Sequence, residues 1–317
     1  MENNLYPFLF EGNYKTALWG GERIAKIFNR ENTPSPCSES WEICAHSSSP
    51  SVISNGSLAG RDLESVIKEF GVKIVGTESP KENEFPLLIK LIDAKTRLSV
   101  QVHPNEKTAP LTKGEPKTEM WYVLGCDEGK TSVSIFAGLK EGVNGNDIES
   151  AIESGKFSDV IVEHDAQAGD CFFIPGGLVH AIGDGALIYE VQQSSNTTYR
   201  LYDWGRVGAD GKARELHVKE SVATIDYSLP VPQKQKDVSC PFFNFKTVDL
   251  KGDIEINTNG KSFTALFVAE GSAKITWQGG EISLPFGTSI LIPALCTAKL
   301  SGEAKYFITT LSDKDTP

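Results

Sequence analysis

The chain has 317 residues, 39% of them hydrophobic and 23% charged, a composition typical of globular proteins and a length sufficient for two domains. Its 31 basic and 42 acidic residues give a net charge of −11, which disfavours binding to nucleic acid or to an anionic membrane. An anionic substrate must therefore be bound by a local cluster of lysine and arginine side chains.

The N-terminal segment shows no targeting signal. Residues 1–15 have no basic region ahead of an apolar core, and no run in the chain approaches the roughly 18 apolar residues of a membrane span. The six cysteines are scattered without a CxxC pair, which is typical of reduced thiols rather than of a disulfide framework. We therefore expect a cytoplasmic protein with buried thiols, among which Cys44, beside polar residues, is the one to examine for reactivity.

Strands dominate the predicted secondary structure. Helical patterns are confined to residues 61–71, 145–156 and 217–226. Short β-branched or aromatic runs bounded by Gly, Pro, Asn or Asp recur along the rest of the chain, at 86–93, 97–104, 119–125, 132–138, 170–176, 186–193, 265–271, 273–279 and 289–294. Many short strands separated by turns predict an all-β-dominated fold, a jelly roll or sandwich, with a few short helices.

A proline-containing segment at 228–241 divides this pattern. It has three prolines and no apolar period, so we predict that it crosses between two domains, residues 1–230 and residues 238–317.

An internal repeat supports this division. The matched segments are 169–182 with 287–300, and 119–125 with 265–271. In this pairing Ala265 stands at the position of Glu119, and Ala298 stands at the position of His180. We therefore expect only the first copy to have groups that can bind a metal.

Four polar side chains of the first copy are candidate metal ligands: Gln101, His103, Glu119 and His180. Side chains two apart on a strand share a face, so Gln101 and His103 point the same way, and a β barrel can bring the other two beside them. This set of nitrogen and oxygen donors suits Zn²⁺, Fe²⁺, Mn²⁺ or Co²⁺. The alternative is that each histidine caps a turn or packs in the core. Two histidines at strand–turn positions, with a carboxylate on an adjacent strand, favour the metal.

These residues carry a resemblance to a known family. The segment from Gly169 to His180 is similar to the second signature motif of the cupin superfamily, and QVHP with Glu119 and Gly125 resembles the first motif with its leading histidine replaced by glutamine. Across residues 6–230 the chain resembles the short bacterial form of type I mannose-6-phosphate isomerases. The blocks that match in order are LWGG (18–21), SESWEICAH (38–46), PLLIKLIDAKTRLSVQVHP (86–104), GEPKTEMWYVL (114–124), IPGGLVHAIG (174–183) and YEVQQSSNTTYRLYDWGR (189–206).

The resemblance implies a fold and a reaction. The fold is two tandem cupin-type jelly-roll barrels, a catalytic N-terminal one and a C-terminal one without a metal site. One Zn²⁺ per chain is implied, bound by Gln101, His103, Glu119 and His180. The implied reaction interconverts mannose 6-phosphate and fructose 6-phosphate through a cis-enediol, so the expected partner is a hexose 6-phosphate.

The resemblance also implies roles for individual residues. Arg200 matches the essential arginine of the family, and Lys90, Ser99 and Lys117 match residues that line the sugar-phosphate site. Lys117 and Glu190 are both candidate bases for the proton transfer, and the sequence does not choose between them. The oligomeric state is left open between a monomer and a homodimer.

Other functions fit parts of the pattern. One is another metal-dependent cupin enzyme, such as an iron dioxygenase or a different sugar isomerase, and the other is a non-catalytic sugar-binding barrel. A dioxygenase site needs no phosphate-binding cations, so Lys90, Lys117 and Arg200 favour the phosphosugar isomerase. Glu42 is expected either to orient Arg200 or a metal ligand, or to be an exposed strand carboxylate.

Overall fold

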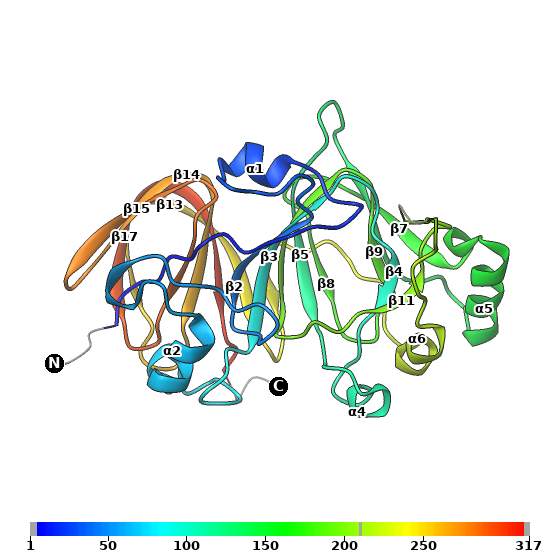
Figure 1. The fold of residues 1–317 in the computed structure, drawn as a ribbon, viewed down its shortest axis with the longest axis horizontal. Coiled ribbons are helices and arrows are strands. Elements are labelled where there is room, and N and C mark those ends of the chain that lie inside the picture. Colours follow the sequence, from blue (N-terminus) through cyan, green and yellow to red (C-terminus); the bar gives the residue numbers. More distant parts are fainter. Residues whose placement is uncertain (1–4, 209–210, 314–317) are drawn as a thin grey trace.

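The computed structural model describes residues 5–208 and 211–313, and antiparallel β-strands dominate them (Figure 1). The strands of these residues form three sheets. The all-β-dominated fold expected from the short, turn-bounded runs is therefore confirmed. None of the helices in the same residues is long and apolar enough to cross a membrane.

The first two sheets form a sandwich. The strands of the first, in spatial order, are β1 (Tyr14–Lys15), β2 (Glu39–Cys44), β3 (Leu87–Ala94), β10 (Ala186–Gln193), β5 (Glu119–Cys126) and β8 (Cys171–Ile174). Those of the second are β11 (Tyr199–Tyr202), β4 (Val100–Val102), β9 (His180–Ile182), β6 (Val133–Leu139) and β7 (Ile161–Ala166). Trp121 and Ile188 of the first sheet pack in one cluster with Ile135 and Ile182 of the second. The two sheets therefore enclose a common core.

The third sheet is built from long strands that bend. Its strands are β12 (Val238–Ser239), β13 (Asn244–Asn257), β17 (Thr297–Thr310), β14 (Thr264–Trp277) and β15 (Gly280–Pro285), with β16 (Ser289–Ile292) paired to β14. At Gly271, which has a φ of 72°, a Cβ would lie 2.5 Å from the carbonyl oxygen of Glu303, so only glycine fits this close crossing. Leu266 before the crossing and Ile275 after it belong to the same core cluster, so each long strand contributes to the core on both sides of the bend.

Three of the helices were expected. The patterns at 61–71, 145–156 and 217–226 correspond to α2 (Leu63–Phe70), α5 (Gly145–Ser154) and α6 (Val218–Thr224). The side chain of Asp62 accepts a hydrogen bond from the backbone N–H of Ser65 and caps α2, and Asn144 caps α5 in the same manner. Short elements that the sequence analysis did not predict are α1 (Arg23–Phe28), η1 (Gly56–Leu58), α3 (Val72–Val75), α4 (Ala109–Thr112) and η2 (Phe157–Asp159).

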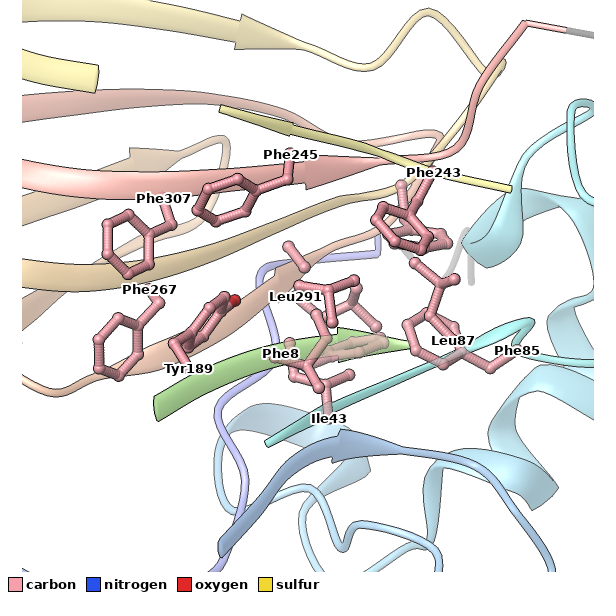
Figure 2. Packing of buried hydrophobic residues seen from close by; sticks show 14 of the residues in the cluster. Phe8, Ile43, Phe85, Leu87, Tyr189, Phe243, Phe245, Phe267, Leu291 and Phe307 are labelled. Atoms are coloured by element: carbon pink, nitrogen blue, oxygen red, sulfur yellow. The ribbon is translucent and has the colours of Figure 1, made fainter. Parts of the chain in front are cut away.

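A second core joins the third sheet to the outer face of the first (Figure 2). Tyr189 of β10 lies 5.0 Å from the rings of both Phe267 and Phe307, measured between ring centroids. Phe8, near the start of the described chain, pairs with Leu291 of β16. These contacts pack the C-terminal strands firmly against the strands that carry the candidate ligands.

Candidate functional site

Three of the predicted ligands converge inside the sandwich. His103 follows β4, Glu119 begins β5 and His180 begins β9. Nε2 of His103 lies 3.7 Å from Oε2 of Glu119, and Nε2 of His180 lies 3.5 Å from Oε1. One ligand atom from each residue lies within 4.8 Å of the others, and all three side chains are buried. The three groups are close enough to coordinate one ion.

The unpartnered polar atoms of this cluster fit a metal. Both ring nitrogens of His103, Oε1 of Glu119 and Nε2 of His180 are buried and have no hydrogen-bond partner in the described residues, and Oε2 of Glu119 lies 3.0 Å from Nζ of Lys117. Nδ1 of His180 lies 2.8 Å from the carbonyl oxygen of Leu178, an arrangement that leaves Nε2 as the lone-pair nitrogen facing the cluster. Burying such groups without partners is costly, and a cation at their centre removes that cost.

The histidines of the cluster are neutral, as ligands must be. Burial lowers the pKa of His180 to about 3, and the hydrogen bond to Leu178 opposes this only in part. Burial, with the positive charge of Lys117, lowers the pKa of His103 well below its ordinary value. Both imidazoles therefore offer a lone pair at neutral pH.

Gln101 lies next to this cluster. It is the register partner of His180 across the β4–β9 pair and of Arg200 across the β4–β11 pair. Gln101 is half-buried and lines the adjoining cavity. The strand register thus brings the fourth predicted ligand beside His180.

A cavity of about 420 Å³ opens beside the cluster. His103, Glu119 and His180 form the ligand cluster, and the other six predicted site residues line this cavity: Lys90, Ser99, Gln101, Lys117, Glu190 and Arg200. The lining also includes residues that the sequence analysis did not select, among them Lys15, Glu39, Ser48, Ser49, Asn196, Thr198 and Arg214. The polar lining and the ligand cluster together form the candidate active site.

Lys90 lies between two carboxylates. Its Nζ is 3.2 Å from Oε1 of Glu190 and 3.5 Å from Oε2 of Glu39. Burial disfavours the charged amine, but the two carboxylates outweigh it and raise the pKa of Lys90 above its ordinary value. The two carboxylates offset the free-energy cost of burying a charged amine in an apolar strand. The sequence alone did not decide whether Lys90 faces the site or the solvent.

Glu190 and Lys117 make different contacts. Burial favours the protonated form of Glu190, but Lys90, Lys117 and a hydrogen bond from Trp121 lower its pKa, so it is ionised. Oε2 of Glu190 accepts the indole N–H of Trp121 at 2.9 Å, and Oε1 faces the ammonium nitrogen of Lys90 at 3.2 Å. Nζ of Lys117 lies 3.0 Å from Oε2 of Glu119.

Arg200 extends from β11 at the rim of the cavity. One of its terminal nitrogens donates to the carbonyl oxygen of Glu215 at 2.7 Å, and its Nε is buried without a partner in the described residues. Burial and the nearby Arg214 lower its pKa, yet a guanidinium stays protonated at neutral pH. Arg214 itself is bound to Asp203, at 2.7 and 2.6 Å.

The expectation for Glu42 is corrected, whereas the expectation that Cys44 is a buried thiol is confirmed. Glu42 neither orients Arg200 nor is exposed, because its carboxylate is buried, pairs with Arg30 at 2.8 Å and accepts a hydrogen bond from Ser289 at 2.6 Å. It therefore joins the N-terminal strands to the third sheet. Cys44 is buried, and burial raises the pKa of its thiol to about 11, so it is not an activated nucleophile.

The repeat pairing is corrected by one residue. Gly169 and Gly287 make equivalent backbone bonds, to Val123 and to Val268, which aligns Glu119 with Thr264 rather than with Ala265. Ala265 belongs to the core between the sheets, on the opposite face of β14. The two segments were aligned by their turn glycines, but Val123 corresponds to Val268, so Gly125 corresponds to Glu270 and Gly271 lies one residue further along the chain. Thr264 and Ala298 thus occupy the two ligand positions of the C-terminal copy.

Comparisons with known proteins agree with this geometry. A family model described as phosphomannose isomerase type I, catalytic domain, matches residues 8–134, and one described as mannose-6-phosphate isomerase, cupin domain, matches residues 233–310.

Relatives match nearly the whole chain. The mannose-6-phosphate isomerase of Bacillus subtilis is 34% identical, over 96% of this chain and 99% of its own length. That of Streptococcus mutans is 32% identical, over 90% of this chain and 92% of its own length. A crystal structure of a mannose 6-phosphate isomerase from Bacillus subtilis superposes with a TM-score of 0.85 at 26% identity, covering 96% of this chain and 99% of that one.

Proposed function

The chain belongs to the type I phosphomannose isomerase family, and we infer that it is a mannose-6-phosphate isomerase, which interconverts mannose 6-phosphate and fructose 6-phosphate. The observation that carries this function is the juxtaposition of a metal-ligand cluster with a cavity lined by cations. A dioxygenase or a simple sugar-binding barrel has no need of that cationic lining.

One zinc ion is the metal we propose, with His103, Glu119, His180 and Gln101 as its ligands. Two neutral imidazoles, one carboxylate and one carboxamide oxygen suit this ion. When bound, zinc supplies a Lewis acid that favours negative charge on the O1/O2 edge of the sugar. The buried, unpartnered atoms of the two histidines and Glu119 support this assignment.

Glu190 is the proposed base. Its ionised carboxylate lines the cavity, with Oε2 bonded to Trp121 and Oε1 beside the ammonium of Lys90. Glu190 takes the proton from C2 of the aldose and returns it to C1, while the hydroxyl proton moves from O2 to O1. Lys90 stays protonated and holds this carboxylate ionised, so it is unsuited to act as the base itself.

The remaining cavity residues bind the sugar phosphate or stabilise the charge of the enediolate. Arg200 lies beside Gln101 in the strand register and is placed to stabilise the enediolate charge. Lys117 and Ser99 line the part of the cavity that binds the sugar, and Lys117 is paired with Glu119. The catalytic unit we propose spans residues 1–230, with residues 238–317 packed against it. The cytoplasm is the proposed compartment, because all six cysteines are free thiols in the described residues.

A coupled isomerase assay tests the function. The purified chain should convert mannose 6-phosphate to fructose 6-phosphate, lose this activity to a strong chelator and regain it when zinc is returned. Zinc content is measured on each sample as the control. A fully metallated protein that turns over neither sugar phosphate contradicts the assignment.

A further inference from the structure

Most cations that line the active-site cavity already have a carboxylate partner. Lys90 is paired with Glu39 and Glu190, and Lys117 is paired with Glu119. Arg214 is bound by both oxygens of Asp203. The charges of these three cations are therefore largely compensated before any substrate arrives.

Lys15 and Arg200 are the exceptions. Both line the cavity, and neither makes an ion pair with a carboxylate among residues 5–208 and 211–313. Arg200 is adjacent to Gln101 in the strand register, which places it at the metal end of the cavity. Lys15 lies on β1, at the far edge of the first sheet from β5, the strand of Glu119. The two uncompensated charges thus come from different sheets, Lys15 from the first and Arg200 from the second.

The surroundings of Lys15 hold its ammonium in place without neutralising it. Its Nζ donates to Oδ1 of Asn13 at 2.8 Å and to Oγ of Ser49 at 2.5 Å, and it lies 4.5 Å from the ring centroid of Trp41. These three neighbours are uncharged, and the carboxylate of Glu39, the register partner of Lys15, is bonded instead to Trp41 and paired with Lys90. An ammonium has three N–H donors, so these two bonds leave one for a ligand.

Hydroxyl groups accompany this cation. Ser48 and Ser49 both line the cavity beside Lys15. The turn that bears them is fixed, because Oγ of Ser48 lies 2.7 Å from Nδ1 of His46 and Oγ of Ser49 donates to Asn13 at 2.9 Å. Because the hydroxyl hydrogen of Ser49 is donated to Asn13, the third N–H of Lys15 is the donor that is left for a phosphate group.

Trp41 connects Lys15 with the reacting end of the cavity. Its indole lies 4.5 Å from Nζ of Lys15 and 5.5 Å from Nζ of Lys90, so both ammonium groups contact the same ring. Lys90 in turn contacts Glu190 at 3.2 Å. Lys15 and Glu190 line the same cavity, so a ligand bound there can contact both.

We propose that Lys15, held in place by Asn13 and Ser49, binds the 6-phosphate of the substrate. This proposal rests on the function inferred above, since it names the group that holds one end of that substrate. The phosphate carries its charge in the ground state and the transition state alike, so Lys15 should contribute to binding and hardly to the chemical step. The local positive charge also explains how a chain with a net charge of −11 attracts a dianion.

The test compares Lys15→Met and Lys15→Arg with the wild type. Methionine keeps the contact with Trp41 but removes the charge, whereas arginine keeps the charge. We expect Lys15→Met to raise KM for mannose 6-phosphate about 10- to 100-fold, the size of one lost hydrogen bond between charged groups, with kcat within about threefold. Lys15→Arg should keep KM within about fivefold of the wild type. Lys26→Met, which removes an exposed lysine outside the cavity, is the matched charge control.

Binding of inorganic phosphate, measured by calorimetry on the zinc-loaded protein, is the second readout. It does not depend on turnover, so it tests Lys15 even if the isomerase assay fails. The dissociation constant of phosphate should rise with KM in Lys15→Met and not in Lys26→Met. Unchanged phosphate binding in Lys15→Met overturns the proposal. If Arg214→Met weakens phosphate binding and Lys15→Met does not, the phosphate is bound by Arg214 instead.

Discussion

The ammonium nitrogen of Lys90 lies 3.2 Å from Oε1 of Glu190, and both side chains are buried at the wall of the cavity. Burial disfavours the charged form of each, yet their attraction raises the pKa of Lys90 and contributes to lowering that of Glu190. Each group thus keeps the other ionised. For a carboxylate that must accept a proton, this pairing extends the pH range of activity toward acid.

Lys90→Met is expected to narrow that range. Without the ammonium, the pKa of Glu190 rises, so the carboxylate becomes protonated at a higher pH and the acid limb of kcat/KM moves upward by about one to two pH units. The profile is measured with zinc content determined at every pH, and Lys90→Arg should keep the wild-type limb. An acid limb that does not move in Lys90→Met means that Glu190 is not the essential base.

Glu190→Gln tests the base directly. Glutamine keeps the acceptor for Trp121 but cannot take up a proton, so kcat should fall about 10²- to 10⁴-fold with little change in KM. Steady-state kinetics on the zinc-loaded variant measure both. Lys117→Met is the comparison: if it abolishes kcat with normal zinc content while Glu190→Gln remains active, the proton transfer belongs to Lys117.

Zinc stoichiometry should be one per chain. Thr264 and Ala298 stand where the N-terminal copy has Glu119 and His180, so the third sheet has neither the carboxylate nor the imidazole. Elemental analysis of the purified protein should give one ion, and His180→Ala should lower that number. Two tightly held ions per chain contradict the assignment of a single site.

The ligand cluster could be predicted because it depends on strand geometry alone. Gln101 and His103 share a strand face, and the spacing of Glu119 and His180 matched a recognisable motif, so the sequence predicted groups that the fold brings together. The repeat was recognised for a similar reason. Its register was wrong by one residue because the segments were aligned by their turn glycines, and Gly271 lies one residue further along its strand than Gly125 does.

The ion pairs of the cavity could not be predicted in this way. Lys90 and Glu39 lie 51 positions apart in the chain, and their contact requires the β2–β3 register, which the sequence did not give. Lys15 belongs to a two-residue strand, too short to recognise from a pattern. Glu42 was expected either to orient a site residue or to be exposed, and neither alternative anticipated its partner Ser289, which comes from the distant third sheet.

The core between the sheets should be a major source of stability. Phe307 is fully buried and contacts the rings of Tyr122, Tyr189, Phe245 and Phe267 (Figure 2). Its replacement by alanine should lower the free energy of unfolding by about 3–5 kcal/mol. Chemical denaturation measures this loss.

An exposed residue provides the control for that measurement. Leu111→Ala truncates a side chain that is 76% exposed and should change the free energy of unfolding by less than about 0.5 kcal/mol. A loss below about 1 kcal/mol in Phe307→Ala would show that the two parts of the chain are held together by other contacts.

Arg200 should act on the transition state rather than on binding. Its Nε is buried without a partner in the described part of the chain, its guanidinium faces the cavity lining, and β11 places it beside Gln101. Charge on the sugar oxygens appears only as the enediolate forms, so an interaction with those oxygens lowers the barrier without tightening substrate binding. Arg200→Ala should therefore reduce kcat about 10²- to 10³-fold, the loss typical of one oxyanion-stabilising donor, with a much smaller change in KM. Arg200→Lys should recover part of kcat, since it restores the charge but not the planar pair of donors.

The measurement is steady-state kinetics at saturating zinc, with metal content checked in each variant. If Arg200→Ala retains nearly normal kcat with zinc bound, its contact with the carbonyl oxygen of Glu215 is its whole role, and the positive charge at the reacting end must come from Lys117 and the metal.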